Sequence, residues 1–152
     1  MKKLMMVLVM VLGSVSLSGQ NNVKNLTEWN LDTYAYQCLQ DLKIDNVVII
    51  IHQYNGLIYG VYPALVERSG NIYNITISGT NGYSGALKCL GHEIFHMSQY
   101  ETGRLTNIDK KAIVFNGLKY EVSEKSHYDD PQEVEARNEG LRLFKQYAFI
   151  LN

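Results

Sequence analysis

The segment from Ser84 to Tyr100 constrains the fold of this chain most strongly, because it carries two patterns at once. Apolar residues spaced three and four apart predict a helix with one stripe toward a core: Leu87, Leu90, Ile94 and Met97. At about 100° per residue, His92 and His96 project to the side nearly opposite that stripe. The segment therefore predicts a helix with an apolar core on one side and a polar environment on the other.

The two histidines belong to the pattern His92-Glu93-Ile94-Phe95-His96, which is HExxH. Residues four apart on a helix lie on one side, so both imidazoles can reach one small cation while the Glu93 carboxylate lies beside it. Zinc held by neutral imidazoles polarises a bound water, and an adjacent glutamate can accept the water's proton as general base. Two structural histidines are the alternative, but these would be expected on the apolar stripe. We therefore interpret the helix as part of a zinc site.

A catalytic zinc site needs a third protein ligand and an open position for water. The longer pattern HExxHxxGxxH is absent, since Gln99 stands at its glycine position and Thr102 at its third histidine. The ligand must therefore come from further along the chain. Glu133 is the leading candidate, because on the last predicted helix it lies in the middle of the apolar face, beside Ala136 and Gly140. A carboxylate there needs a cation or several donors.

Other roles for Glu133, and other ligands, stay open. Asp130 is a good N-cap for the last helix, so Glu133 could complete a capping box, or pair with Arg137 four residues on. Glu135 is the first substitute ligand, although the helical wheel places it on the solvent side. Behind it come Asp129, Asp130 and His127.

The remaining elements indicate one α+β domain. The chain has 152 residues, is 46% hydrophobic, contains only two prolines and shows no repeat. We expect an antiparallel or mixed sheet of about three strands and a short second hairpin. The expected order is a helix at 27–43, a buried strand at 47–54, a hairpin turn at Asn55-Gly56, a strand at 57–62, an edge strand at 72–78, the HExxH helix at 84–100, a hairpin at 112–122 and a glutamate helix from Asp130.

The first residues predict export. Lys2 and Lys3 precede an apolar run at 4–12 and then small residues, which is the layout of a signal peptide over residues 1–19; a short anchor or buried helix is the alternative. The run is too short to span a bilayer, so we expect no membrane span in the mature domain at 20–152. A periplasmic or extracellular location would allow Cys38 and Cys89 to pair, although buried free thiols are common. Cys89 is also a weaker candidate for a soft metal ligand.

The charge balance argues against a nucleic-acid partner. Fourteen Lys and Arg stand against fifteen Asp and Glu, for a net charge of -1, and the longest basic run is Lys110-Lys111. Such a chain has little electrostatic attraction for phosphate backbones. We expect a monomer whose partner is a peptide or protein substrate. His52, in an apolar strand, is interpreted as a hydrogen-bonded residue of the core or sheet edge.

HExxH and the later fragment Pro131-Gln132-Glu133-Val134-Glu135-Ala136 make the chain resemble the gluzincin class of zinc metallopeptidases. In that class a glutamate from a later helix joins the two histidines. The resemblance covers roughly residues 82–144. It implies a zincin-like fold in which His92, His96 and Glu133 bind one Zn²⁺ ion and Glu93 acts as general base and proton shuttle. It also implies that the edge strand Ile72 to Ser78 holds the peptide substrate by main-chain pairing.

Two parts of the implied site depart from the class or stay open. An Asp or Asn often stands four residues after the ligand glutamate and orients a zinc histidine, but Arg137 occupies that position, so a backbone carbonyl or Asn138 would have to replace it. An oxyanion donor is also implied, and His127 or Tyr128 could serve. The sequence thus predicts an exported zinc metallopeptidase that hydrolyses peptide bonds. The alternatives are a catalytically inactive binding or inhibitory domain of the same fold and a zinc amidase acting on cell-wall peptides.

Overall fold

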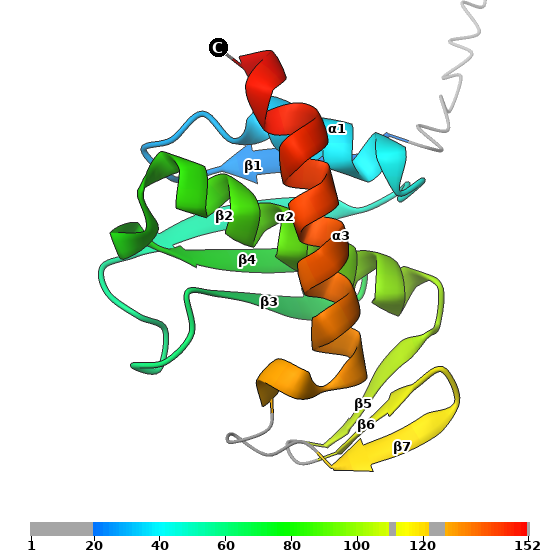
Figure 1. The fold of residues 1–152 in the computed structure, drawn as a ribbon. Helices are drawn as coiled ribbons and strands as arrows, with labels where there is room; N and C mark the ends of the chain where they lie inside the picture. Colours follow the sequence, from blue (N-terminus) through cyan, green and yellow to red (C-terminus); the bar gives the residue numbers. More distant parts are fainter. Residues whose placement is uncertain (1–19, 110–111, 122–126, 152) are drawn as a thin grey trace, which may run out of the picture.

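The structure is a computed structural model that describes residues 20–109, 112–121 and 127–151 (Figure 1). It is an α+β domain with a larger sheet covered by helices and a smaller sheet at one end. The predicted signal peptide, residues 1–19, lies outside the described residues. Within those residues, no helix is both long enough and apolar enough to cross a membrane.

The larger sheet has four strands in the order β1-β2-β4-β3. Their bounds are β1 Asn22–Asn25, β2 Val48–Tyr54, β3 Ala64–Ser69 and β4 Ile72–Ser78. β1 pairs parallel with β2 and β2 pairs parallel with β4, whereas β3 pairs antiparallel with β4. A mixed sheet is thus confirmed, but two of its strands, β1 and β3, were not predicted. β1 has the polar sequence Asn-Val-Lys-Asn, which carries no clear strand pattern.

The prediction that β4 is an edge strand is wrong. It lies between β2 and β3, with Tyr73 and Ile75 fully buried on one face of the sheet and Asn74 half-buried on the other. Alternation shows that one face of a strand is more open than the other, but it does not reveal the strand's neighbours. The His52 imidazole makes the expected hydrogen bond, since its Nε2 is 3.3 Å from Asn74 Oδ1.

The strand predicted at 57–62 is also wrong. The backbone reverses there, because Tyr59 and Gly60 have φ values of 51° and 72°, and Ile58 pairs only with Tyr62. Two successive left-handed residues form a tight turn that reverses a chain. The chain then reaches the far side of β4, where β3 begins at Ala64. The turn signal Asn55-Gly56 therefore opens a crossing loop and not a hairpin.

Three α-helices complete the domain: α1 Asp32–Asp41, α2 Gly82–Glu101 and α3 Pro131–Tyr147. α1 is shorter than predicted, because a polar turn replaces its first residues, with the Thr27 N–H donating to Asn25 Oδ1. α2 contacts β3 and β4, and α3 packs across α2 (Figure 1). The predicted apolar stripe of α2 is confirmed in the core, where each of its residues is at most 2% exposed: Leu87, Leu90, Ile94 and Met97.

An antiparallel sheet of three strands follows α2: β5 Leu105–Asp109, β6 Ala112–Phe115 and β7 Leu118–Glu121. The predicted second hairpin is confirmed as β6 and β7, which are joined at Asn116-Gly117, where both residues have positive φ. The sequence missed β5, because Leu-Thr-Asn-Ile-Asp reads as a polar loop. This sheet has its own small apolar cluster: Leu105, Ile113 and Phe115.

Candidate metal centre

A close crossing of α2 and α3 brings the candidate ligands together. Gly140 lies so near α2 that a Cβ atom there would be 2.8 Å from the His92 nitrogen and 2.9 Å from its Cα. Gly91 is similarly confined, since a Cβ atom there would be 3.2 Å from the Gly140 oxygen. Backbones can approach this closely only where no side chain intervenes. Gly140 and Gly91 therefore allow α3 to pack directly against α2.

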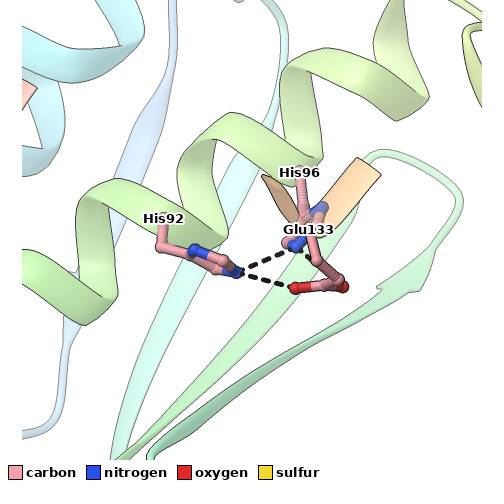
Figure 2. A group of neighbouring side chains, drawn as sticks. All are labelled: His92, His96 and Glu133. Carbon is pink, nitrogen blue, oxygen red and sulfur yellow. Dashed lines mark hydrogen bonds and ion pairs between the residues drawn. The ribbon is translucent and has the colours of Figure 1, made fainter. Parts of the chain in front are cut away.

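Three side chains converge beside this crossing (Figure 2). His92 and His96 come from consecutive turns of α2, and Glu133 comes from α3, two turns before Gly140. His92 Nε2 is 3.0 Å from His96 Nε2 and 3.1 Å from Glu133 Oε2, and His96 Nε2 is 3.2 Å from Glu133 Oε1. Among the described side chains, these three form a group that could hold a metal ion. The fold thus brings together the three side chains that the sequence predicted as metal ligands.

The spacing of the three side chains fits a tetrahedral zinc ion. Ligand atoms about 2.0–2.2 Å from zinc at tetrahedral angles lie about 3.3–3.6 Å apart. The observed separations of 3.0, 3.1 and 3.2 Å are slightly shorter than the lower end of that range. Two imidazoles and one carboxylate are also donors that zinc accepts, and three protein ligands are the number found in catalytic zinc sites.

Glu133 controls the charge of His96. Burial favours the neutral imidazole and so lowers the pKa of His96, but the hydrogen bond and the charge of Glu133 outweigh burial and raise the pKa to about 9. The Glu133 side chain is only 13% exposed, and a carboxylate in such a place needs a cation or several hydrogen-bond donors. A bound metal ion would supply the positive charge in place of the proton.

Gln99 holds His96 in position, a role that the sequence did not reveal. Its side chain is fully buried, and its Oε1 is 2.7 Å from His96 Nδ1. Its Nε2 donates to Gln132 O at 3.1 Å and to Glu135 Oε2 at 2.9 Å. Because the amide nitrogen already has two acceptors, Oε1 faces the histidine. In the neutral ring the proton therefore lies on Nδ1, and the lone pair of Nε2 points toward Glu133, as a metal ligand requires.

Glu135, the substitute ligand, is engaged elsewhere. Its two oxygens accept from Arg104 Nη2 at 2.7 and 2.9 Å, and the Arg104 guanidinium lies over the Phe115 ring. These contacts connect α3 to the small sheet. The first of the two hydrogen bonds of a capping box is absent, because the Asp130 side chain makes no capping hydrogen bond. The Glu133 carboxylate lies against the histidines.

A cleft of about 830 Å³ opens onto the three ligands. Its wall includes Glu93, which is 7% exposed and follows His92 on α2. A cleft of this size can accept a short peptide segment. The sides of the cleft are largely apolar and come from β3 and the small sheet: Ala64, Leu65, Val66, Leu105 and Ile113. The predicted general base, the ligands and a sheet edge therefore share one cleft.

The predicted oxyanion donors lie just before α3, in the short 3-10 helix His127–Asp129. The side chain of His127 is outside what the structure describes. Tyr128 is 69% exposed and lines the cleft. The Arg137 guanidinium lies 3.6 Å from the centre of the Tyr128 ring, and its Nη1 donates to the Tyr128 carbonyl at 3.0 Å. Arg137 is therefore engaged with Tyr128 and not with Glu133, and Asn138 is exposed.

Both cysteines are free thiols. Cys38 is fully buried in the core, and burial raises its pKa to about 12. Cys89 lines the cleft, and burial raises its pKa to about 11. Cys89 is not part of the ligand group, so the idea of a sulfur ligand is not supported.

Comparison of the chain with protein-family models, with curated proteins and with solved structures found no match. Any functional conclusion therefore depends on the geometry and chemistry of the site.

Proposed function

We propose that this chain is a zinc-dependent metallopeptidase with a small zincin-like fold, as its resemblance to the gluzincins implies. One observation carries the proposal: Glu133, from a separate helix, meets His92 and His96 at separations of 3.1 and 3.2 Å, beside Glu93 in an open cleft. A structural ion pair needs only one imidazole, whereas here two imidazoles face one carboxylate. The signal-peptide pattern at 1–19 further supports export, and we propose that the mature domain acts as a monomer on peptides or proteins.

The chain's own residues account for most of the chemistry. When bound, zinc would act as a Lewis acid that makes water a nucleophile near neutral pH. Glu93, at the wall of the cleft, accepts the proton of the attacking water and passes it to the leaving amide nitrogen. Gln99 keeps His96 in the tautomer that a ligand needs. Tyr128 or His127 donates to the oxyanion that forms on the attacked carbonyl.

β3 takes the substrate-binding role that the sequence assigned to Ile72–Ser78. It is an edge strand of the larger sheet that lines the cleft, and within the described residues it pairs only with β4. Its outer edge offers backbone N–H and C=O groups to an extended peptide. The β3 residues that line the cleft are Ala64, Leu65 and Val66. A peptide added to this edge would pass in front of the ligands.

Zinc content and peptide cleavage test the proposal in the purified protein. The unmodified protein should hold one zinc ion per chain and cleave members of a peptide library. His96→Ala should lose the zinc, whereas Glu93→Gln should keep it and lose activity by a factor of about 10²–10⁴. His52→Ala is the matched control, because His52 lies in β2, outside the cleft, and should retain both zinc and activity.

Three outcomes would contradict the proposal. Unchanged peptide cleavage by Glu93→Gln would show that Glu93 is not the general base. Stoichiometric zinc without cleavage of any peptide would favour the inactive binding domain. Cleavage confined to cell-wall muropeptides would favour the zinc amidase.

A further inference from the structure

We propose that Arg137 binds a carboxylate group of the substrate, so that the enzyme prefers peptides that carry a carboxylate near the scissile bond. This inference rests on the proposed peptidase function and specifies its substrate class. Arg137 stands one helical turn after Glu133 on α3 and lines the same cleft as the ligands.

Two contacts with Tyr128 orient the Arg137 guanidinium, which has no acidic partner among the described residues. Its central carbon lies 3.6 Å from the centre of the Tyr128 ring, and Nη1 donates to the Tyr128 carbonyl. Arg142, on the same helix, provides the contrast, because it pairs with Asp41 and Glu139. An oriented guanidinium with free N–H groups is suited to bind a carboxylate with two parallel hydrogen bonds.

The charge balance of the cleft also favours an anionic substrate group. Among the described residues that line the cleft, the acidic ones are Glu93 and Glu133, and the basic ones, apart from histidine, are Lys88 and Arg137. A divalent metal ion would balance the two glutamates, which leaves the two basic side chains in excess. Lys88 lies over the Phe144 ring at 5.0 Å and pairs with no carboxylate in the described part of the chain. A concave site with net positive charge attracts anions.

The position of Arg137 limits where the carboxylate lies on the substrate. Arg137 lines the same cleft as Glu133, and its guanidinium reaches back toward the start of α3, where it contacts Tyr128. A carboxylate on Arg137 therefore lies within a few residues of the carbonyl that is attacked. The terminal carboxylate of a peptide meets this requirement, and so does an Asp or Glu side chain at a nearby position. The terminal carboxylate and the side-chain carboxylate would bind Arg137 in the same way, and the experiment distinguishes between them.

Cleavage of matched peptides by three proteins tests the inference. The peptides share one sequence that the unmodified protein cleaves, and they carry a free terminal carboxylate, a terminal amide, or a terminal amide with a glutamate introduced near the cleaved bond. The unmodified protein should prefer a carboxylate-bearing peptide by about tenfold or more in kcat/KM. Arg137→Gln should lose this preference mainly through KM and keep its zinc. Lys145→Gln, an equal charge change on an exposed residue of α3, should behave like the unmodified protein.

Binding measurements separate failure of this inference from failure of the peptidase proposal. Zinc-loaded Glu93→Gln protein is titrated calorimetrically with N-acetyl-glycyl-leucine and with its amide. The acid should bind about tenfold more tightly, and the added Arg137→Gln change should remove this advantage. Equal binding of acid and amide, or a preference that survives Arg137→Gln, would overturn the carboxylate site even if the protein cleaves peptides. An Arg137-dependent preference in a protein that cleaves nothing would support the carboxylate site and reject the peptidase.

Discussion

The two faces of α2 are buried to a similar degree but depend on different interactions. Toward the core, Leu90 and Ile94 are fully buried among apolar side chains. Toward α3, His96 is 6% exposed and Gln99 is fully buried, and the polar atoms of both side chains have partners. Apolar contacts tolerate small shifts, whereas a buried polar group that loses its partner costs about 1–3 kcal/mol. We therefore expect the first face to set stability and the second to set the chemistry.

The largest effect on stability should follow from a change to the apolar face. Ile94→Ala should lower the free energy of unfolding by about 2–5 kcal/mol, because it removes buried methyl groups and leaves a cavity. Urea unfolding of the metal-free protein measures this loss. Zinc affinity of the folded variant should change little. Ile108→Ala, at a residue that is 50% exposed in β5, is the control and should cost much less. A tenfold loss of zinc affinity in Ile94→Ala would show that the two faces are not separable.

A change where α2 and α3 cross should affect both the stability of the fold and the affinity for zinc. Gly140→Ala places a methyl group within 2.8 Å of the His92 nitrogen, so the helices must separate. We expect a loss of about 1–3 kcal/mol in unfolding free energy. Zinc affinity should fall as well, since Glu133 moves with α3. Asn138→Ala, at an exposed position of the same helix, should change neither quantity. Unaltered zinc binding by Gly140→Ala would contradict the idea that the crossing sets the ligand distances.

The smallest of the three effects should follow from a change to the polar face of α2, and it should be a change in zinc affinity. Gln99→Met removes the partner of His96 Nδ1 while keeping a side chain of similar length, and zinc affinity should fall by about 10–100-fold. Nitrogen-15 NMR of the neutral His96 ring should show that the Nδ1–H tautomer no longer dominates. Gln40→Met, at an exposed position of α1, is the control. An unchanged zinc affinity and an unchanged His96 tautomer would show that Gln99 does not position His96.

The sequence was most informative where a pattern lies within one helix. Spacing alone separated the apolar stripe of α2 from His92 and His96, because helical geometry fixes the direction of each side chain. The same reasoning placed Glu133 beside Gly140 on the inner face of α3. The convergence of the two helices followed from the chemical requirement for a third ligand.

The features that the sequence missed depend on contacts between distant residues. The alternation of apolar and polar residues in Ile72–Ser78 indicated that one face of the strand is more open. It did not show that β3 pairs with the free side of β4 and so becomes the edge strand. Gln99 differs from any other buried glutamine only through its partners on α3, Gln132 and Glu135. The helical wheel of α3 placed Glu135 on the solvent side. A wheel describes one helix alone, so it could not show that Arg104, from another segment of the chain, pairs with Glu135.

The position of Glu133 on α3 determines when the candidate metal site is complete. In an unfolded chain the two histidines remain close in sequence, but the third ligand is separated from them by the whole small sheet. A metal ion should therefore bind the folded domain much more tightly than the unfolded chain, and by linkage it should stabilise the docking of α3. A chain that ends before α3 would keep HExxH intact and still lack the complete ligand set.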